Sequence, residues 1–135
     1  MSQYLLLKQG TIHNAVDEEA FVADILIEDG KIKKIAPVLE GKVINEAAVI
    51  DAMGIDVYPG FVDAHCHLGL DGYAVGFAGQ DFNELGDPVT PQLSAIDAIN
   101  PQDETFRMAR EGGVTCVSTG PGSSNVIGGT FCNIK

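Results

Sequence analysis

The chain has 135 residues and a formal net charge of −11, from 19 acidic and 8 basic residues. Hydrophobic residues make up 45% of it, which is typical of one or two small folded domains rather than of a disordered chain. So acidic a chain is repelled by phosphate groups, and we therefore expect neither nucleic acid nor an anionic membrane as a partner.

The cysteines indicate a reducing compartment, and the N-terminal residues do not form a signal peptide. The chain has three cysteines, Cys66, Cys116 and Cys132. An odd number without a Cys-x-x-Cys motif argues against a disulfide framework. The apolar run at residues 4–7 is too short for a signal peptide or a membrane span. We therefore expect a cytoplasmic protein in which each cysteine fills space as a small apolar side chain.

The first part of the chain predicts short β-strands. They are expected at residues 4–12, 21–28, 31–35 and 43–51. Asp29-Gly30 is a strong hairpin signal between the second and the third, because a type I′ turn needs positive φ at both central residues. Lys31, Lys33 and Lys34 are expected to blunt an edge strand, and His13 to lie exposed in the first strand. Residues 1–57 thus predict a small sheet or half of a β-sandwich.

A strand at residues 58–67 ends in a His-x-His pair. Side chains alternate across a strand, so His65 and His67 share a face with Asp63 and can hold one metal ion. The opposite face is wholly apolar, and Cys66 on it points away from both histidines. One polar and one apolar face fit a strand that lines a barrel and is backed by helices.

The rest of the chain alternates loops with regular elements. Residues 68–89 contain five glycines and no periodicity, which predicts a long loop. Thr90-Pro91 and Asn100-Pro101 each have the pattern of an N-cap followed by proline, so helices are expected from each, the second ending at Gly112-Gly113. A strand at 114–118 then completes a strand–helix–strand crossover, which requires parallel strands. A Gly/Ser-rich segment at 119–129 leads to a candidate last strand at 130–134.

Two passages resemble the amidohydrolase superfamily. Ile-Leu-Ile-Glu-Asp-Gly-Lys-Ile at 25–32 resembles the N-terminal hairpin of that family, and Pro-Gly-Phe-Val-Asp-Ala-His-Cys-His-Leu at 59–68 resembles its first barrel strand. Their order and spacing match as well. The segment at 120–129 is similar to a stretch in members related to imidazolonepropionase.

The resemblance implies an architecture and a site. A small β-sandwich built from both chain ends would flank a TIM-type barrel that holds one or two metals, usually zinc, at its mouth. His65 and His67 would match the first two metal ligands, and Asp63 would orient an imidazole N–H. Metal-bound water would attack a C–N bond, typically of a cyclic amide. The loop after the parallel strand offers candidate residues on the substrate side: Gly120, Ser123, Asn125 and Gly128.

The chain departs from the family in its extent. A complete barrel needs about 250 residues, so residues 58–135 have room for only the first βαβ portion. The family's other metal ligands and its catalytic aspartate have no counterpart here, so no catalytic residue is assigned. We therefore expect an α/β fold, a β-rich half-sandwich followed by an incomplete TIM-type barrel. It would form the N-terminal portion of a metal-dependent amidohydrolase, inactive as this chain alone.

Two alternatives stay open. Unpaired sheet edges and an uncovered apolar face would make the chain a non-catalytic module that self-associates into a homo-oligomer. In the other alternative, a second subunit supplies the ligand that completes a metal site at His65 and His67, since zinc normally takes at least three protein ligands.

Overall fold

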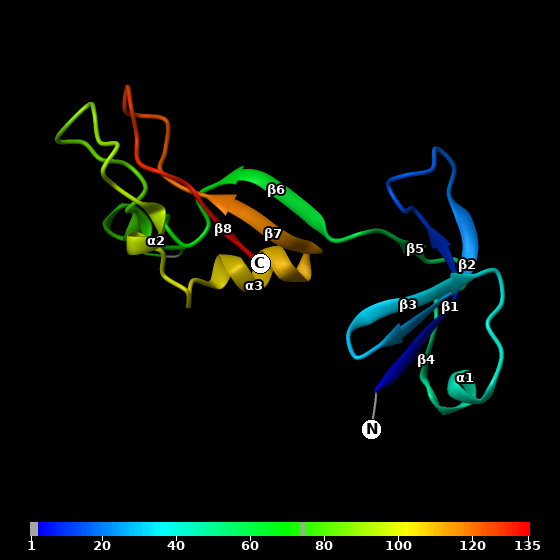
Figure 1. Cartoon of the computed structure of the whole chain (residues 1–135). Helices are drawn as coiled ribbons and strands as arrows, with labels where there is room; N and C mark the ends of the chain where they lie inside the picture. The colour runs from blue at the N-terminus through cyan, green and yellow to red at the C-terminus, as the bar shows by residue number, and fades with distance from the viewer. Residues whose placement is uncertain (1–2, 74) are drawn as a thin grey trace. The chain divides into compact units, whose positions relative to one another are not determined.

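A computed structural model describes residues 3–73 and 75–135 of the chain (Figure 1). The chain divides into two compact units between Pro59 and Gly60, named here the N-terminal unit and the C-terminal unit. In the described ranges, no helix is long and apolar enough to cross a membrane. The assignment of the first unit to a sandwich and of the second to a barrel stays a prediction.

The N-terminal unit is a five-stranded sheet of order β3-β2-β1-β4, in which β5 also pairs with β1. Strand β2 is antiparallel to β1 and β3, whereas β4 and β5 are parallel to β1. The strands are β1 (Tyr4–Ile12), β2 (Phe21–Glu28), β3 (Lys31–Ala36), β4 (Ala48–Asp51) and β5 (Asp56–Val57). The first three confirm the strands predicted from the sequence.

The β2–β3 hairpin turns as predicted. Asp29 and Gly30 have φ angles of 50° and 76°, so both central residues of the turn are left-handed. Strand β3 lies at the edge of the sheet and carries the predicted lysines. The Lys33 Nζ lies 2.8 Å from the Glu28 Oε2, across the hairpin.

Buried apolar side chains and one buried carboxylate hold this sheet. The Asp24 side chain, 1% exposed, accepts hydrogen bonds from the backbone amides of Gln9 and Leu39, each at 2.9 Å. Gln9 has a φ of 58° where the register of β1 against β2 shifts, so Asp24 stabilises an irregularity in the strand. The apolar residues form two clusters, Leu6 with Leu26 and Leu39, and Ile12 with Ala23 and Ile25.

The strand predicted at 43–51 is wrong in its first half. Helix α1 (Lys42–Glu46) occupies that part, and only Ala48–Asp51 is strand. Ile44 packs against the cluster around Leu6, so burial against the sheet overrides the strand preference of β-branched residues. His13 follows β1 rather than lying within it. Its Nε2 is 2.8 Å from the Asp56 Oδ1, and its ring stacks on Tyr58 at 4.3 Å between centroids.

The C-terminal unit contains a three-stranded sheet of order β6-β7-β8. Its strands are β6 (Phe61–Cys66), β7 (Val114–Thr119) and β8 (Cys132–Ile134). Strands β6 and β7 are parallel, and helix α3 (Glu104–Glu111) connects them and packs against β7, which confirms the predicted crossover. Strand β8 confirms the candidate last strand but runs antiparallel to β7, unlike the strands of a TIM-type barrel.

The helix predicted from Thr90-Pro91 is wrong in its first half. Helix α2 is confined to Ala95–Ala98, because the Leu93 carbonyl accepts from the Thr130 amide and the Ala95 amide donates to the Thr130 carbonyl, both at 3.0 Å, in place of helical hydrogen bonds. Helix α3 starts at Glu104, with Asp103 as the N-cap, and ends at Gly112 as predicted. The predicted loop at 68–89 contains one short 3₁₀ helix, η1 (Gly76–Gly79), and residue 74 of that prediction lies outside the described residues.

The sequence predicts that helices cover the apolar face of β6, but the structure leaves this face uncovered. Val62 is 69% exposed and Ala64 is exposed too, because α3 packs on β7. In the part of the chain that the structure describes, β6 has β7 as its single neighbour in the sheet. One edge and one apolar face of β6 are therefore open to solvent.

Candidate metal centre

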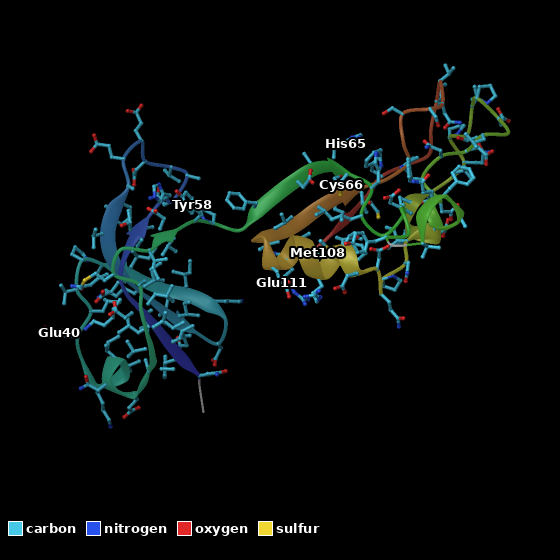
Figure 2. The ribbon with its side chains drawn as sticks, turned by 180° about the vertical axis from the view of Figure 1, so that it is seen from behind. Glu40, Tyr58, His65, Cys66, Met108 and Glu111 are labelled. Carbon is cyan, nitrogen blue, oxygen red and sulfur yellow. The ribbon has the colours of Figure 1, made fainter. Side chains whose placement is uncertain are left out.

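The two histidines of the His-x-His pair lie together at the end of β6, where Figure 2 labels His65. Their ring centroids are 5.4 Å apart, and the ring planes meet at 80°. His65 lies within the strand and is exposed, whereas His67 follows the strand and is half-buried. The structure thus brings the two predicted metal ligands side by side.

The His67 ring is oriented by a backbone carbonyl. Its Nδ1 lies 2.6 Å from the Gly120 oxygen, and a carbonyl only accepts hydrogen bonds, so Nδ1 carries the proton and donates it. In the neutral ring this leaves the lone pair on Nε2. A ring that donates one N–H to a carbonyl and keeps the other nitrogen free is typical of a metal-ligating histidine. The Gly120 amide donates to the Cys66 carbonyl at 3.1 Å, which fixes the loop against β6.

Two aromatic rings that the sequence analysis missed cover the histidines. Phe82 stacks on His67, with centroids 5.1 Å apart and planes within 16°, and Phe131 lies 5.0 Å from His65. Gly120 permits this packing, because a Cβ at that position would lie 2.4 Å from the Phe131 ring. Both rings come from loops distant in sequence. In the sequence, each of these phenylalanines is marked only by lying in or beside a glycine-rich segment, and this signal is too weak to predict a contact with the histidines.

Asp63 does not make the contact expected of it. Its carboxylate accepts a hydrogen bond from the backbone amide of His65 at 3.1 Å, rather than from an imidazole N–H. The side chain is exposed and has only to turn towards its own strand to reach that amide. A role of Asp63 towards a metal therefore stays a prediction. The cysteines, including Cys66 between the histidines, are free thiols and half-buried.

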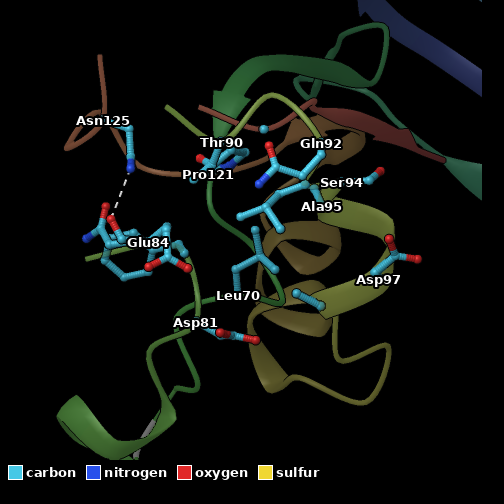
Figure 3. Close-up of a pocket in the computed structure, with 15 residues that line it drawn as sticks. Leu70, Asp81, Glu84, Thr90, Gln92, Ser94, Ala95, Asp97, Pro121 and Asn125 are labelled. Carbon is cyan, nitrogen blue, oxygen red and sulfur yellow. Dashed lines mark hydrogen bonds between the residues drawn. The ribbon is translucent and has the colours of Figure 1, made fainter. Parts of the chain in front are cut away.

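The four predicted substrate-side residues take different positions. Gly120 holds His67, and Asn125 lines a cavity of about 330 Å³ together with Phe82 (Figure 3). Ser123 is exposed and Gly128 half-buried, and neither lines this cavity. The acidic side chains on the cavity wall are Asp81, Glu84 and Asp97.

The loop that follows His67 is anchored to the start of α3. The Asn100 amide donates to the Gly69 carbonyl at 2.9 Å, and the Tyr73 amide donates to the Asp103 carboxylate at 3.4 Å. Burial of Asp103 acts to raise the pKa of its carboxyl group. Hydrogen bonds from the Thr105 hydroxyl and amide and from Tyr73 outweigh burial, so this pKa lies below its ordinary value.

The donor set fits part of a metal site. Two imidazoles at the end of one strand, one of them with its Nε2 left free, suit zinc or another divalent transition metal. Over residues 3–73 and 75–135, however, no three His, Cys, Asp or Glu side chains gather as a metal site would require. A metal held by His65 and His67 would therefore need at least one further ligand from elsewhere.

Comparisons with known proteins show which proteins this chain resembles. An amidohydrolase from Thermotoga maritima has a solved structure that matches 97% of this chain with a TM-score of 0.84 and 40% sequence identity. Among curated proteins, the amidohydrolase tasK of Hapsidospora irregularis is 35% identical over 116 residues, which are 85% of this chain. No family model matches the chain.

The chain belongs to the amidohydrolase superfamily. It corresponds to the N-terminal portion of such a protein, as the sequence resemblance predicted. Two further amidohydrolase relatives match about half of the chain: a dihydroorotase from Caldicellulosiruptor saccharolyticus, 42% identical over 69 residues, and a D-hydantoinase from Geobacillus stearothermophilus, 46% identical over 67 residues.

The chain spans only a small share of these amidohydrolases. The matched region is 12% of the Hapsidospora protein, 16% of the dihydroorotase and 13% of the D-hydantoinase. It covers 33% of the Thermotoga chain. Activity, substrates and partners of the whole proteins do not follow for this chain from similarity over so short a region.

Proposed function

We propose that this chain contributes the first two metal ligands, His65 and His67, to an enzyme that hydrolyses a C–N bond. The observation that carries the proposal is the hydrogen bond from the His67 Nδ1 to the Gly120 carbonyl, which leaves Nε2 as the coordinating nitrogen. The relatives named dihydroorotase and D-hydantoinase support a cyclic amide or a related small molecule as the substrate.

In this proposal the chain's residues hold and orient the site. Gly120 fixes the His67 ring, while Phe82 and Phe131 shield one side of each imidazole from water. Zinc or another divalent metal, when bound, would supply Lewis acidity and lower the pKa of a coordinated water. The sequence has no counterpart of the family's catalytic aspartate, so the 135 residues alone should be inactive.

The parallel β6–α3–β7 unit supports a wider architecture. We propose that it begins a TIM-type barrel completed by further strands, and that the five-stranded sheet is the N-terminal part of the adjoining β-sandwich. We propose a cytoplasmic location as well, in line with the acidic composition and the free thiols.

Metal binding by the 135-residue chain tests the proposal. Elemental analysis after purification without tag or added metal should find little bound metal, and titration with Co²⁺ should reveal a weak site. That site should disappear in a His65→Ala/His67→Ala variant and persist in His13→Ala, whose histidine pairs with Asp56 instead. Cobalt binding that the double variant leaves unchanged would refute the assignment of both ligands.

An activity assay tests the other half of the proposal. The chain alone should not hydrolyse dihydroorotate or hydantoin, with or without added zinc, because the remaining ligands and the base are missing. Turnover that disappears in His67→Ala would show that the described residues suffice, contrary to the proposal. Turnover that survives this variant would come from another site or a contaminant.

Self-association is the second candidate function, favoured by the exposure of β6. Its open edge and the 69% exposure of Val62 suit pairing with a second copy. Sedimentation velocity should show a dimer or larger species that Val62→Asp dissociates and that Val16→Asp, at an even more exposed position in the N-terminal unit, does not. A monomer at high concentration would rule this out. If a second subunit completes the metal site, His67→Ala should lose metal and keep the oligomer.

A further inference from the structure

Two loops of the C-terminal unit are joined along their length beside the histidines. Backbone amides of Gly122, Thr90 and Thr130 donate to Phe82, Ile127 and Leu93 carbonyls at 2.7, 2.8 and 3.0 Å. These bonds connect residues 82–93 with residues 122–130, which are separated in sequence by α2, α3 and β7. The paired loops therefore behave as one structural element, named here the loop pair.

Asn125 fastens the tip of the loop pair. Its side-chain amide donates one hydrogen bond to the Glu84 carbonyl at 3.0 Å (Figure 3) and another to the Asp87 carbonyl at 2.8 Å. One half-buried side chain thereby satisfies two carbonyls of the same turn, and both bonds cross from one loop to the other. Ser124 adds a hydroxyl bond to the Asn83 side chain at 2.9 Å.

The loop pair contacts His67 at its base, through Phe82. Phe82 precedes the turn that Asn125 fastens, and its ring stacks on the His67 imidazole. The Gly122 amide holds the Phe82 backbone, and a larger residue at 122 would displace the Asn83 side chain, because a Cβ there would lie 2.2 Å from the Asn83 Oδ1. A displacement of the turn at 84–87 would consequently move Phe82 relative to His67.

We propose that Asn125 is a positioning residue that acts through Phe82 to hold the His67 imidazole in the orientation in which Nδ1 donates to Gly120. Two experiments test this inference, and only the second of them rests on the proposed metal role of the histidines. The loop pair contacts the candidate centre without supplying a ligand to it. Asn125 therefore controls how well the histidine pair binds a metal.

The first readout is independent of metal. Stacking under Phe82 should shift the His67 ring protons upfield in the NMR spectrum of the full chain, and Asn125→Leu, similar in size but without a donor, should reduce that shift. Asn125→Gln, which keeps the amide, should restore part of it. Asn14→Leu is the matched control, because Asn14 fastens a turn through its side chain in the N-terminal unit. His67 signals unchanged by Asn125→Leu would overturn the proposal.

The second readout is a double-mutant cycle on Co²⁺ affinity. Asn125→Leu should weaken binding about tenfold, the lower end of what loss of a group supporting a ligand causes. Phe82→Leu should weaken it similarly, and the double variant no further than Phe82→Leu alone, since both changes act on one contact. Additive effects would overturn the path through Phe82. Failure of the unmodified chain to bind Co²⁺ would refute the proposed function, while the NMR cycle on the same variants still decides the role of Asn125.

Discussion

The N-terminal unit and the C-terminal unit are each stabilised by a different kind of interaction. The N-terminal sheet buries two apolar clusters, and its buried carboxylate, Asp24, is fully occupied by backbone amides. The C-terminal sheet leaves Val62 exposed, and hydrogen bonds between backbone and short polar side chains hold its loops. Both clusters therefore lie in the unit without the candidate ligands, whereas hydrogen-bonded loops lie around the histidines.

The largest expected effect concerns the N-terminal core. Leu6 is 1% exposed, so Leu6→Ala should lower the free energy of unfolding of that unit by about 2–5 kcal/mol. Amide hydrogen exchange should then show faster exchange in β1 and β2, with β6 and β7 protected as before. Equal loss of protection in both sheets would show that the two units unfold as one, and the contrast between them would fail.

A crowded glycine gives the corresponding test in the C-terminal unit. Gly120→Ala places a Cβ against the Phe131 ring and should cost about 1–3 kcal/mol through overpacking. The NMR signals of His65 and His67 should shift, while those of the N-terminal unit should not. Gly128→Ala is the control, because the added Cβ there would meet nothing nearer than 3.8 Å. Equal effects of the two substitutions would contradict the crowding argument.

The N-cap of α3 should give a moderate and pH-dependent effect. Asp103→Ala should cost about 0.5–2 kcal/mol, because the Thr105 amide loses its acceptor. The folded pKa of Asp103 is lowered, so its contribution is present above the ordinary value of about 4 and is lost as the pH falls below it. Denaturant unfolding at several pH values should show this loss in the unmodified chain and a weaker one in Asp103→Asn.

The smallest effect is expected at the exposed edge of the N-terminal sheet. The pKa of Glu28 is lowered mainly by its hydrogen bond with Lys33, and also by that with Tyr4. Lys33→Ala should raise this pKa towards its ordinary value, which an NMR titration would measure, and should barely change stability because an exposed ion pair is screened. An unfolding curve clearly shifted by Lys33→Ala would mean that surface charge contributes more to this unit than its core suggests.

Local patterns predicted the hairpin and the parallel crossover correctly. Asp29-Gly30 needs only its own backbone angles to form the turn, and the order of strand, helix and strand settles the direction of β7. Long-range contacts defeated the other predictions. A helix was expected from Thr90, but the Leu93 carbonyl, which the helix would need, is taken by the amide of Thr130, which is 37 residues away. The Lys42–Glu46 segment became helical because Ile44 packs on the Leu6 cluster.

The proximity of His65 and His67 was predictable from the sequence, but the surroundings of the two rings were not. Alternation along one strand suffices to place His65 beside His67. The partners of their rings come from residues 82, 120 and 131, and no periodicity connects these positions with β6. Asp63 shows the limit of strand geometry, since it shares the predicted face and yet bonds to the backbone of His65.

The pairing of β6 with β7 also bears on how the chain is made. His67 precedes its partner Gly120 by 53 residues. At a synthesis rate of about 5–20 residues per second, β6 waits roughly 3–10 s on the ribosome for the strand and the carbonyl that it needs. The β2–β3 hairpin, by contrast, can close as soon as it emerges. During that interval the edge and the apolar face of β6 are exposed on the nascent chain. We therefore expect this protein to be most prone to aggregate while it is being synthesised.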